Sequence, residues 1–254
     1  MYEHHGHHSH CPRYRRSSAI MTTSGIKDSP MRRLFYLIDI TVIGLLYFAL
    51  DAATNAIAFS RNFRVDIIVS TLVKCVFLVF IWFWLQMRGD SVAVLGLKKP
   101  SNWLRSILFG VTAAAIIFIA VYLLERCGFR RDLSAFAPFK GNLELTLYQL
   151  GGVIIGAGFG EEYLFRGFLF QRLAMLFGGS KLGWGMACLI QAALFGFAHA
   201  YQNPLGMLLT GLIGLTMGLV FLGTRRNLWA PIIAHTLYDT ARMVGFYLYG
   251  LPPW

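Results

Sequence analysis

The stretch LTLYQLGGVIIGAGFGEEYLFRGFLFQRLAMLF, residues 145–177, decides how the rest of this chain is interpreted. It is apolar over most of its length, yet Glu161, Glu162 and Arg166 lie near its middle. Ionisable groups inside a membrane span cost about 2.5–3.5 kcal/mol each on insertion scales, so they pair with one another or face a polar cavity. The stretch therefore predicts a membrane helix that carries a polar site.

Helical spacing gives the two glutamates different surroundings. Glu162 and Arg166 are four residues apart, so on a helix they share a face and form an ion pair. Glu161 lies about 100° further round the helix and has no partner within it. A structural clamp between two helices would also explain the group, but we prefer a site in which Glu161 is the working carboxylate.

The composition is that of a polytopic membrane protein. Of the 254 residues 56% are hydrophobic and only 14% are charged, whereas soluble domains contain about 25% charged residues. Several apolar runs reach the roughly 18 residues that suggest a membrane span. We therefore predict an all-α transmembrane bundle of about seven to eight spans. Seven are placed at 34–59, 66–87, 103–125, 144–177, 182–200, 205–223 and 229–249.

The charge distribution predicts topology rather than nucleic-acid binding. Residues 34–254 form one membrane domain, and residues 1–33 are a His-rich basic tail that we expect to be disordered, although such a tract also suits metal binding. With this tail inside, fourteen lysines and arginines lie on the cytoplasmic side and six on the other. We expect an integral protein of a bacterial plasma membrane with a cytoplasmic N-terminus, a partner bilayer and no nucleic-acid partner.

Two glycine series predict close helix packing. Gly152, Gly156 and Gly160 repeat at four-residue intervals in the fourth predicted span, and Gly214 and Gly218 repeat in the sixth. Small residues at this spacing let membrane helices approach backbone to backbone. We expect the first series to hold the span that carries the two glutamates in place.

Two histidines of the late spans complete the set of polar residues. His199 ends the segment FGFAH, and His235 opens the segment HTLYD, in which Asp239 shares its face. A lone core histidine is usually only a satisfied polar group, but two of them with two glutamates and an arginine favour one shared site. A buried carboxylate suits a general base, and histidine deprotonates water or stabilises an oxyanion. The set indicates hydrolysis of an acyl bond by an activated water.

The three signatures together resemble the membrane-embedded CAAX prenyl protease family and its bacterial Abi (CPBP) relatives. That family's patterns are Glu-Glu-x-x-x-Arg, Phe-x-x-x-His and His-x-x-x-Asn or Asp, which occur here at 161–166, 195–199 and 235–239. The resemblance covers about residues 90–245, with a catalytic core of about 144–245. It implies an intramembrane endopeptidase acting on a membrane-associated or lipidated peptide, in a bacterium for example in bacteriocin processing or self-immunity.

The resemblance also implies a role for each residue. Glu161 and His199 activate the attacking water, while His235 and the residue at 239 stabilise the oxyanion. Glu162 and Arg166 orient Glu161 and His199.

Position 239 is the exception, because an ionised aspartate cannot donate a hydrogen bond to an oxyanion. Asp239 is therefore protonated, or orients His235, or helps to hold a metal, or is neutralised by Arg242 three residues later.

A zinc ion is the cofactor that the resemblance suggests. Its ligands are Glu161, His199 and His235, an oxygen and nitrogen set that leaves one position open to water. The sequence lacks a His-Glu-x-x-His helix, which argues against the ordinary arrangement of zinc hydrolases.

One geometric difficulty and two alternatives stay open. The predicted spans put His199 and His235 near opposite membrane faces, so the site closes only if the turn at 201–204 lies inside the membrane or a span begins earlier. Buried acidic and histidine side chains are also typical of a proton-coupled transporter, although no inverted repeat is visible. A non-catalytic membrane scaffold is the other alternative.

Overall fold

The computed structural model describes residues 30–57 and 62–252, and all regular structure in these ranges is helical. The all-α prediction is therefore confirmed, while most of the predicted tail lies outside the described residues. The helices are α1 Pro30–Ile57, α2 Phe63–Met87, η2 Val92–Leu95, α3 Trp103–Arg126, η3 Ser134–Phe139, α4 Leu143–Gly152, η4 Val153–Leu169, α5 Phe170–Leu176, α6 Lys181–Phe197, η5 Ala200–Gln202, α7 Asn203–Gly223 and α8 Trp229–Tyr249.

Five helical stretches are long and apolar enough to cross a membrane. They are residues 30–54, 63–87, 103–126, 143–176 and 200–223. The apolar helix α6 has only 17 residues, and the 21-residue α8 is not among the five. Helix α8 carries the ionisable side chains of the HTLYD segment and of Arg242, which reduce its apolar character. The predicted count of seven to eight spans is thus supported for five.

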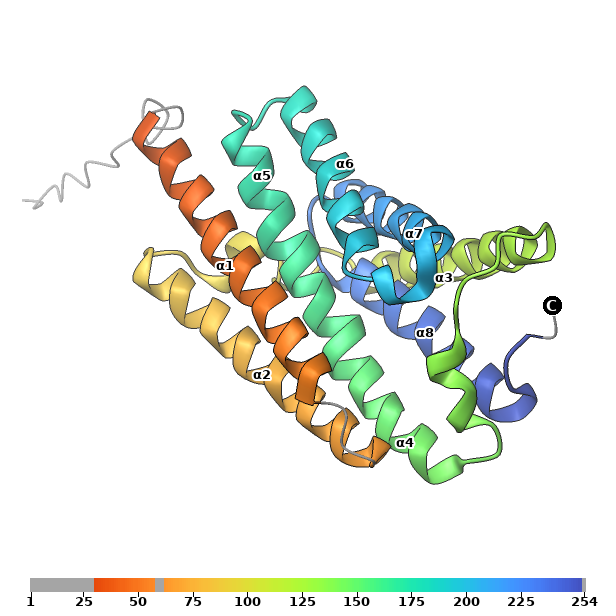
Figure 1. The fold of residues 1–254 in the computed structure, drawn as a ribbon. Coiled ribbons are helices and arrows are strands. Elements are labelled where there is room, and N and C mark those ends of the chain that lie inside the picture. The colour runs from red at the N-terminus through yellow and green to blue at the C-terminus, as the bar shows by residue number, and fades with distance from the viewer. Residues whose placement is uncertain (1–29, 58–61, 253–254) are drawn as a thin grey trace, which may run out of the picture.

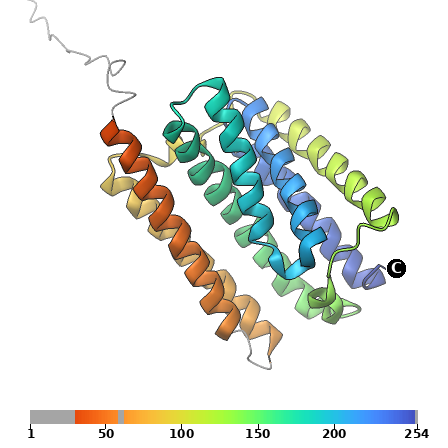
Figure 2. The ribbon, with the colours of Figure 1, turned by 45° about the horizontal axis from the view of Figure 1, so that its top comes forward.

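A long central rod organises the bundle. Helices α4, η4 and α5 follow one another without a break from residue 143 to residue 176 (Figure 1). Helices α1 and α2 pack along one side of this rod, and α6 and α8 pack along the other. Helices α3 and α7 complete that second side by packing on α8 and α6. Figure 2 shows the start of α1 and the C-terminus at opposite ends of the bundle.

The middle of the rod is wound more widely than the predicted α-helix. Val153–Leu169 is π-helical, and the Phe170 N–H still bonds the carbonyl of Phe165 five residues earlier. Such winding is rare and is frequent at functional sites. It encloses both glutamates and Arg166.

Glycines let the rod approach its neighbours on two sides. A Cβ on Gly156 would lie 3.0 Å from Cδ of Lys74 in α2, and a Cβ on Gly152 would lie 3.2 Å from Oγ1 of Thr71. The predicted packing role of this series is confirmed. On the side facing α8, a Cβ on Gly158 would overlap the hydroxyl of Thr236, so that contact requires glycine.

Candidate active site

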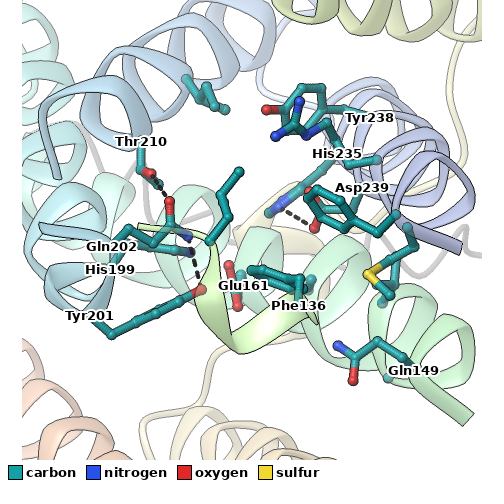
Figure 3. Close-up of a pocket in the computed structure, with 18 of the residues that line it drawn as sticks. Phe136, Gln149, Glu161, His199, Tyr201, Gln202, Thr210, His235, Tyr238 and Asp239 are labelled. Atoms are coloured by element: carbon teal, nitrogen blue, oxygen red, sulfur yellow. Dashed lines mark hydrogen bonds and ion pairs between the residues drawn. The ribbon is translucent and has the colours of Figure 1, made fainter. Parts of the chain in front are cut away.

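The three sequence signatures meet at one cavity of about 180 Å³. Its wall includes Glu161 from η4, His199 from the turn after α6, and His235 and Asp239 from α8 (Figure 3). The remaining two predicted residues are not part of the wall and lie behind it. Residues separated by up to 78 positions in the sequence therefore share one polar space, as the shared-site hypothesis requires.

Glu161 presents a free carboxylate oxygen at this cavity. The residue is only 8% exposed, and its Oε1 lies 3.4 Å from Nζ of Lys74, which reaches in from α2. Its Oε2 is buried and has no hydrogen-bond partner among the described residues. A buried carboxylate oxygen needs a polar partner, so this atom is available to a water molecule or a substrate.

Glu162 and Arg166 form the predicted ion pair, with 2.8 Å between Oε1 and Nη1. Both side chains are fully buried. The same Oε1 lies 2.7 Å from Nδ1 of His235, and the guanidinium lies 4.3 Å from the ring centroid of Phe195. The structure thus places this pair behind His235. The resemblance instead implies that the pair orients Glu161 and His199.

The tautomer of His199 follows from its surroundings. Its Nδ1 lies 2.9 Å from the carbonyl oxygen of Phe195, and a carbonyl only accepts, so Nδ1 carries the proton. The ring also packs on the Phe195 ring, with 4.8 Å between centroids. With the proton on Nδ1, the lone pair of Nε2 is free to accept a second proton.

The turn after α6 removes the geometric difficulty that the sequence posed. Helix α6 ends at Phe197, and α7 begins at Asn203, which adopts a left-handed φ of 66°. The connection before η3 fastens this turn, because the Asp132 N–H donates to the carbonyl of Gln202 at 3.0 Å. His199 therefore reaches the same cavity as His235.

The contacts of Asp239 distinguish among its predicted states. Its Oδ2 lies 3.3 Å from Nε2 of His235, so the contact supports an orienting role. Arg242 does not neutralise it as one alternative predicts, because its Nη1 pairs with Oε2 of Glu125 at 3.0 Å. His235 consequently has a carboxylate at each ring nitrogen.

The predicted zinc ligands do not fit a metal ion as they are placed. Within residues 30–57 and 62–252, no three histidine, cysteine, aspartate or glutamate side chains are grouped to hold one. Of the predicted set Glu161, His199 and His235, the last has both ring nitrogens facing carboxylates. It therefore has no free lone pair for a metal in this arrangement.

Sequence reasoning missed a buried polar network beside the cavity. Glu125 is 1% exposed and pairs with Arg131 at 2.8 Å as well as with Arg242. Arg131 continues to Oε1 of Gln202 at 3.4 Å and to the hydroxyl of Tyr238 at 3.3 Å. The network ties α3 and the turn after His199 to α8. The only available signal was an acidic residue at the end of a predicted span, where it resembled an ordinary loop charge.

The fold and this cavity define a helical membrane protein in which buried acid and imidazole groups meet, an arrangement typical of hydrolytic sites. Residues 143–241 match the family model described as Type II CAAX prenyl endopeptidase Rce1-like. Over these residues the chain is similar to that family, which agrees with the predicted resemblance, and together with the apolar helices the match indicates a protease of a membrane. Helices α1 to α3 lie outside the match. The chain matches no curated protein and no solved structure.

Proposed function

We propose that this protein is an intramembrane endopeptidase whose attacking water is activated by Glu161 and His199. One observation carries the proposal: the unpartnered Oε2 of Glu161 and the half-buried ring of His199 line the same cavity. One group is a carboxylate acceptor and the other an imidazole with a free lone pair. Two such acceptors can orient a water and remove its proton.

The proposed reaction needs only groups of this chain. Glu161 takes one proton from the water, and the oxygen attacks the peptide carbonyl to give a tetrahedral intermediate. Nε2 of His199 accepts a hydrogen bond from the other O–H of the water, and it takes that second proton as the carboxylic acid product ionises. Collapse of the intermediate breaks the C–N bond, and the proton held by Glu161 passes to the leaving nitrogen.

His235 is the proposed donor to the oxyanion. With a carboxylate at each nitrogen, 2.7 Å and 3.3 Å away, its doubly protonated form has both N–H groups satisfied. The Nε2–H group makes the longer contact, to Asp239 at the cavity wall. An oxyanion in the cavity accepts from this N–H in place of Asp239 or together with it. Asp239 then positions the ring instead of donating, which agrees with an ionised carboxylate.

The cavity suggests how the substrate binds. At about 180 Å³ it is smaller than the roughly 300–1,000 Å³ of pockets that enclose drug-sized ligands. Only the residues around the cleaved bond therefore enter it, and the rest of a membrane-associated or lipidated peptide lies outside. Lys74 is the only described lysine in the wall, and its half-exposed amine lies beside Glu161.

A cleavage assay tests the proposal. Purified full-length protein in liposomes is given a membrane-tethered peptide with a fluorescent reporter, and Glu161→Gln and His199→Asn are compared with the wild type. We expect each variant to lose about 10²–10⁴-fold in rate, the usual contribution of general acid–base catalysis.

Glu144→Gln is the matched control for this assay. It makes the same chemical change at a glutamate whose side chain is 55% exposed and that pairs with Arg64 outside the cavity. Its rate should equal that of the wild type. Undiminished cleavage by both Glu161→Gln and His199→Asn would refute the proposed function.

A further inference from the structure

A second cavity, of about 240 Å³, lies at the other end of the helix bundle from the candidate active site. The candidate active site is lined by the first half of α2, whereas this cavity is lined by the connection that follows α2, the start of α3 and the turn after α7. Four cationic side chains line it, and no carboxylate does. They are Lys98, Lys99, Arg105 and Arg225.

These four cations have no internal counter-charge. Among the described residues no acidic side chain pairs with any of them. Elsewhere in the molecule, the buried arginines 131, 166 and 172 all have a carboxylate partner. Cations that line one cavity without a carboxylate partner create a positive potential that favours an anion in the space between them.

The walls of this cavity are built into the fold. The Asn227 side chain, on a residue 6% exposed, donates to the carbonyl of Lys98 at 2.9 Å and accepts from the N–H of Trp229 at 3.0 Å. It therefore fixes the two connections relative to each other. Ser106 also lines the cavity and is 6% exposed. Within the described part of the chain no hydrogen bond of the Ser106 hydroxyl occurs, so this hydroxyl is free to donate into the cavity.

Aromatic residues beside this cavity indicate a position at the membrane surface. Trp103 begins α3 and Trp229 begins α8, and their rings pack with 5.3 Å between centroids. Tryptophan is enriched where membrane helices pass the headgroup region. Basic pockets between membrane helices at this depth bind lipid headgroups.

We propose that this cavity binds a phosphate group, supplied by the headgroup of an anionic membrane lipid. Its oxygens accept hydrogen bonds from the side chains of Lys98, Lys99, Arg105, Arg225 and Ser106. A lipid that also carries a headgroup cation is disfavoured, because four cations repel it. A soluble phosphate offers the same group, and the two sources are separable by experiment. The proposal is independent of the proposed peptide cleavage.

Native mass spectrometry of the full chain in detergent tests the site. The probes are dioleoylphosphatidylglycerol, dioleoylphosphatidylcholine and inorganic phosphate, each titrated separately. We expect the wild type to retain one phosphatidylglycerol at least about tenfold more tightly than phosphatidylcholine. The triple variant Lys98→Gln, Lys99→Gln and Arg225→Gln should lose this preference. Ser106→Ala should weaken phosphatidylglycerol binding about tenfold through the loss of one bond to a charged group.

A control variant removes the same amount of charge from exposed positions at the end of the bundle that carries the candidate active site. It carries Arg126→Gln, Arg130→Gln and Lys140→Gln, three exposed residues that line neither cavity. Its lipid preference should equal that of the wild type, and its thermal unfolding midpoint should match that of the site variant. Equal weakening in both triple variants, or equal binding of the two lipids by the wild type, overturns the proposal. Retention of inorganic phosphate without any preference for phosphatidylglycerol overturns the lipid as its source.

Discussion

The buried pair of Glu162 and Arg166 gives the sharpest prediction about stability and site geometry. Both side chains are fully buried, and Oε1 of the glutamate contacts Nη1 of Arg166 at 2.8 Å and Nδ1 of His235 at 2.7 Å. Glu162→Gln keeps the size of the side chain but removes its charge. Arg166 then stays buried without a counter-charge, which costs about 3–5 kcal/mol.

The assay is unfolding of the purified protein in mixed detergent micelles, with the free energy of unfolding taken from the transition. Arg166→Met and the double variant Glu162→Gln with Arg166→Met complete a double-mutant cycle. Since the double variant no longer contains an unpaired buried charge, it should lose less than the sum of the single variants. We expect a coupling of at least about 2 kcal/mol, within the range for residues of one network.

The exposed pair of Arg64 and Glu144 supplies the control. Its ions are 2.7 Å apart, but the side chains are 53% and 55% exposed, so Glu144→Gln should cost only about 0–1 kcal/mol. If Glu162→Gln costs no more than Glu144→Gln, the central pair is not buried as described. In that case the pair does not hold His235 in place either.

Three further predictions concern the cavity. Asp239→Asn keeps an acceptor for the His235 Nε2–H, so cleavage should stay within about tenfold of the wild type, whereas Asp239→Leu, which has no acceptor, should lose at least about a hundredfold; similar rates in the two variants would contradict the orienting role. Gly158→Val would drive a side chain into Thr236, so folded yield in detergent should collapse, while Gly185→Val, at a glycine with open space around it, should fold normally. Because both nitrogens of His235 face carboxylates, 1,10-phenanthroline should leave cleavage unchanged, and a loss that added zinc restores would show that the ring rearranges to bind metal.

The sequence by itself determined the elements and the composition of the site. Apolar length gave seven helical segments that all occur, with ends shifted by only a few residues, because the cost of burying unpaired backbone groups in lipid allows little but helices. The spacing of Glu162 and Arg166 gave their ion pair, since residues four apart are neighbours on any such helix. The chemical types at 161, 199, 235 and 239 indicated a shared site, and these residues do line one cavity.

Tertiary structure decided which of these residues touch. That His235 rather than His199 contacts Glu162 depends on how α8 packs against the rod, and that packing rests on Gly158 lying against Thr236. Glu161 pairs with Lys74, which belongs to another helix. Glu125 pairs with Arg131, which belongs to the connection before η3. The spacing of residues along one helix cannot predict such contacts, because they form only when whole helices pack side by side. The same packing brings the cations of two connections and of the start of α3 together around the second cavity.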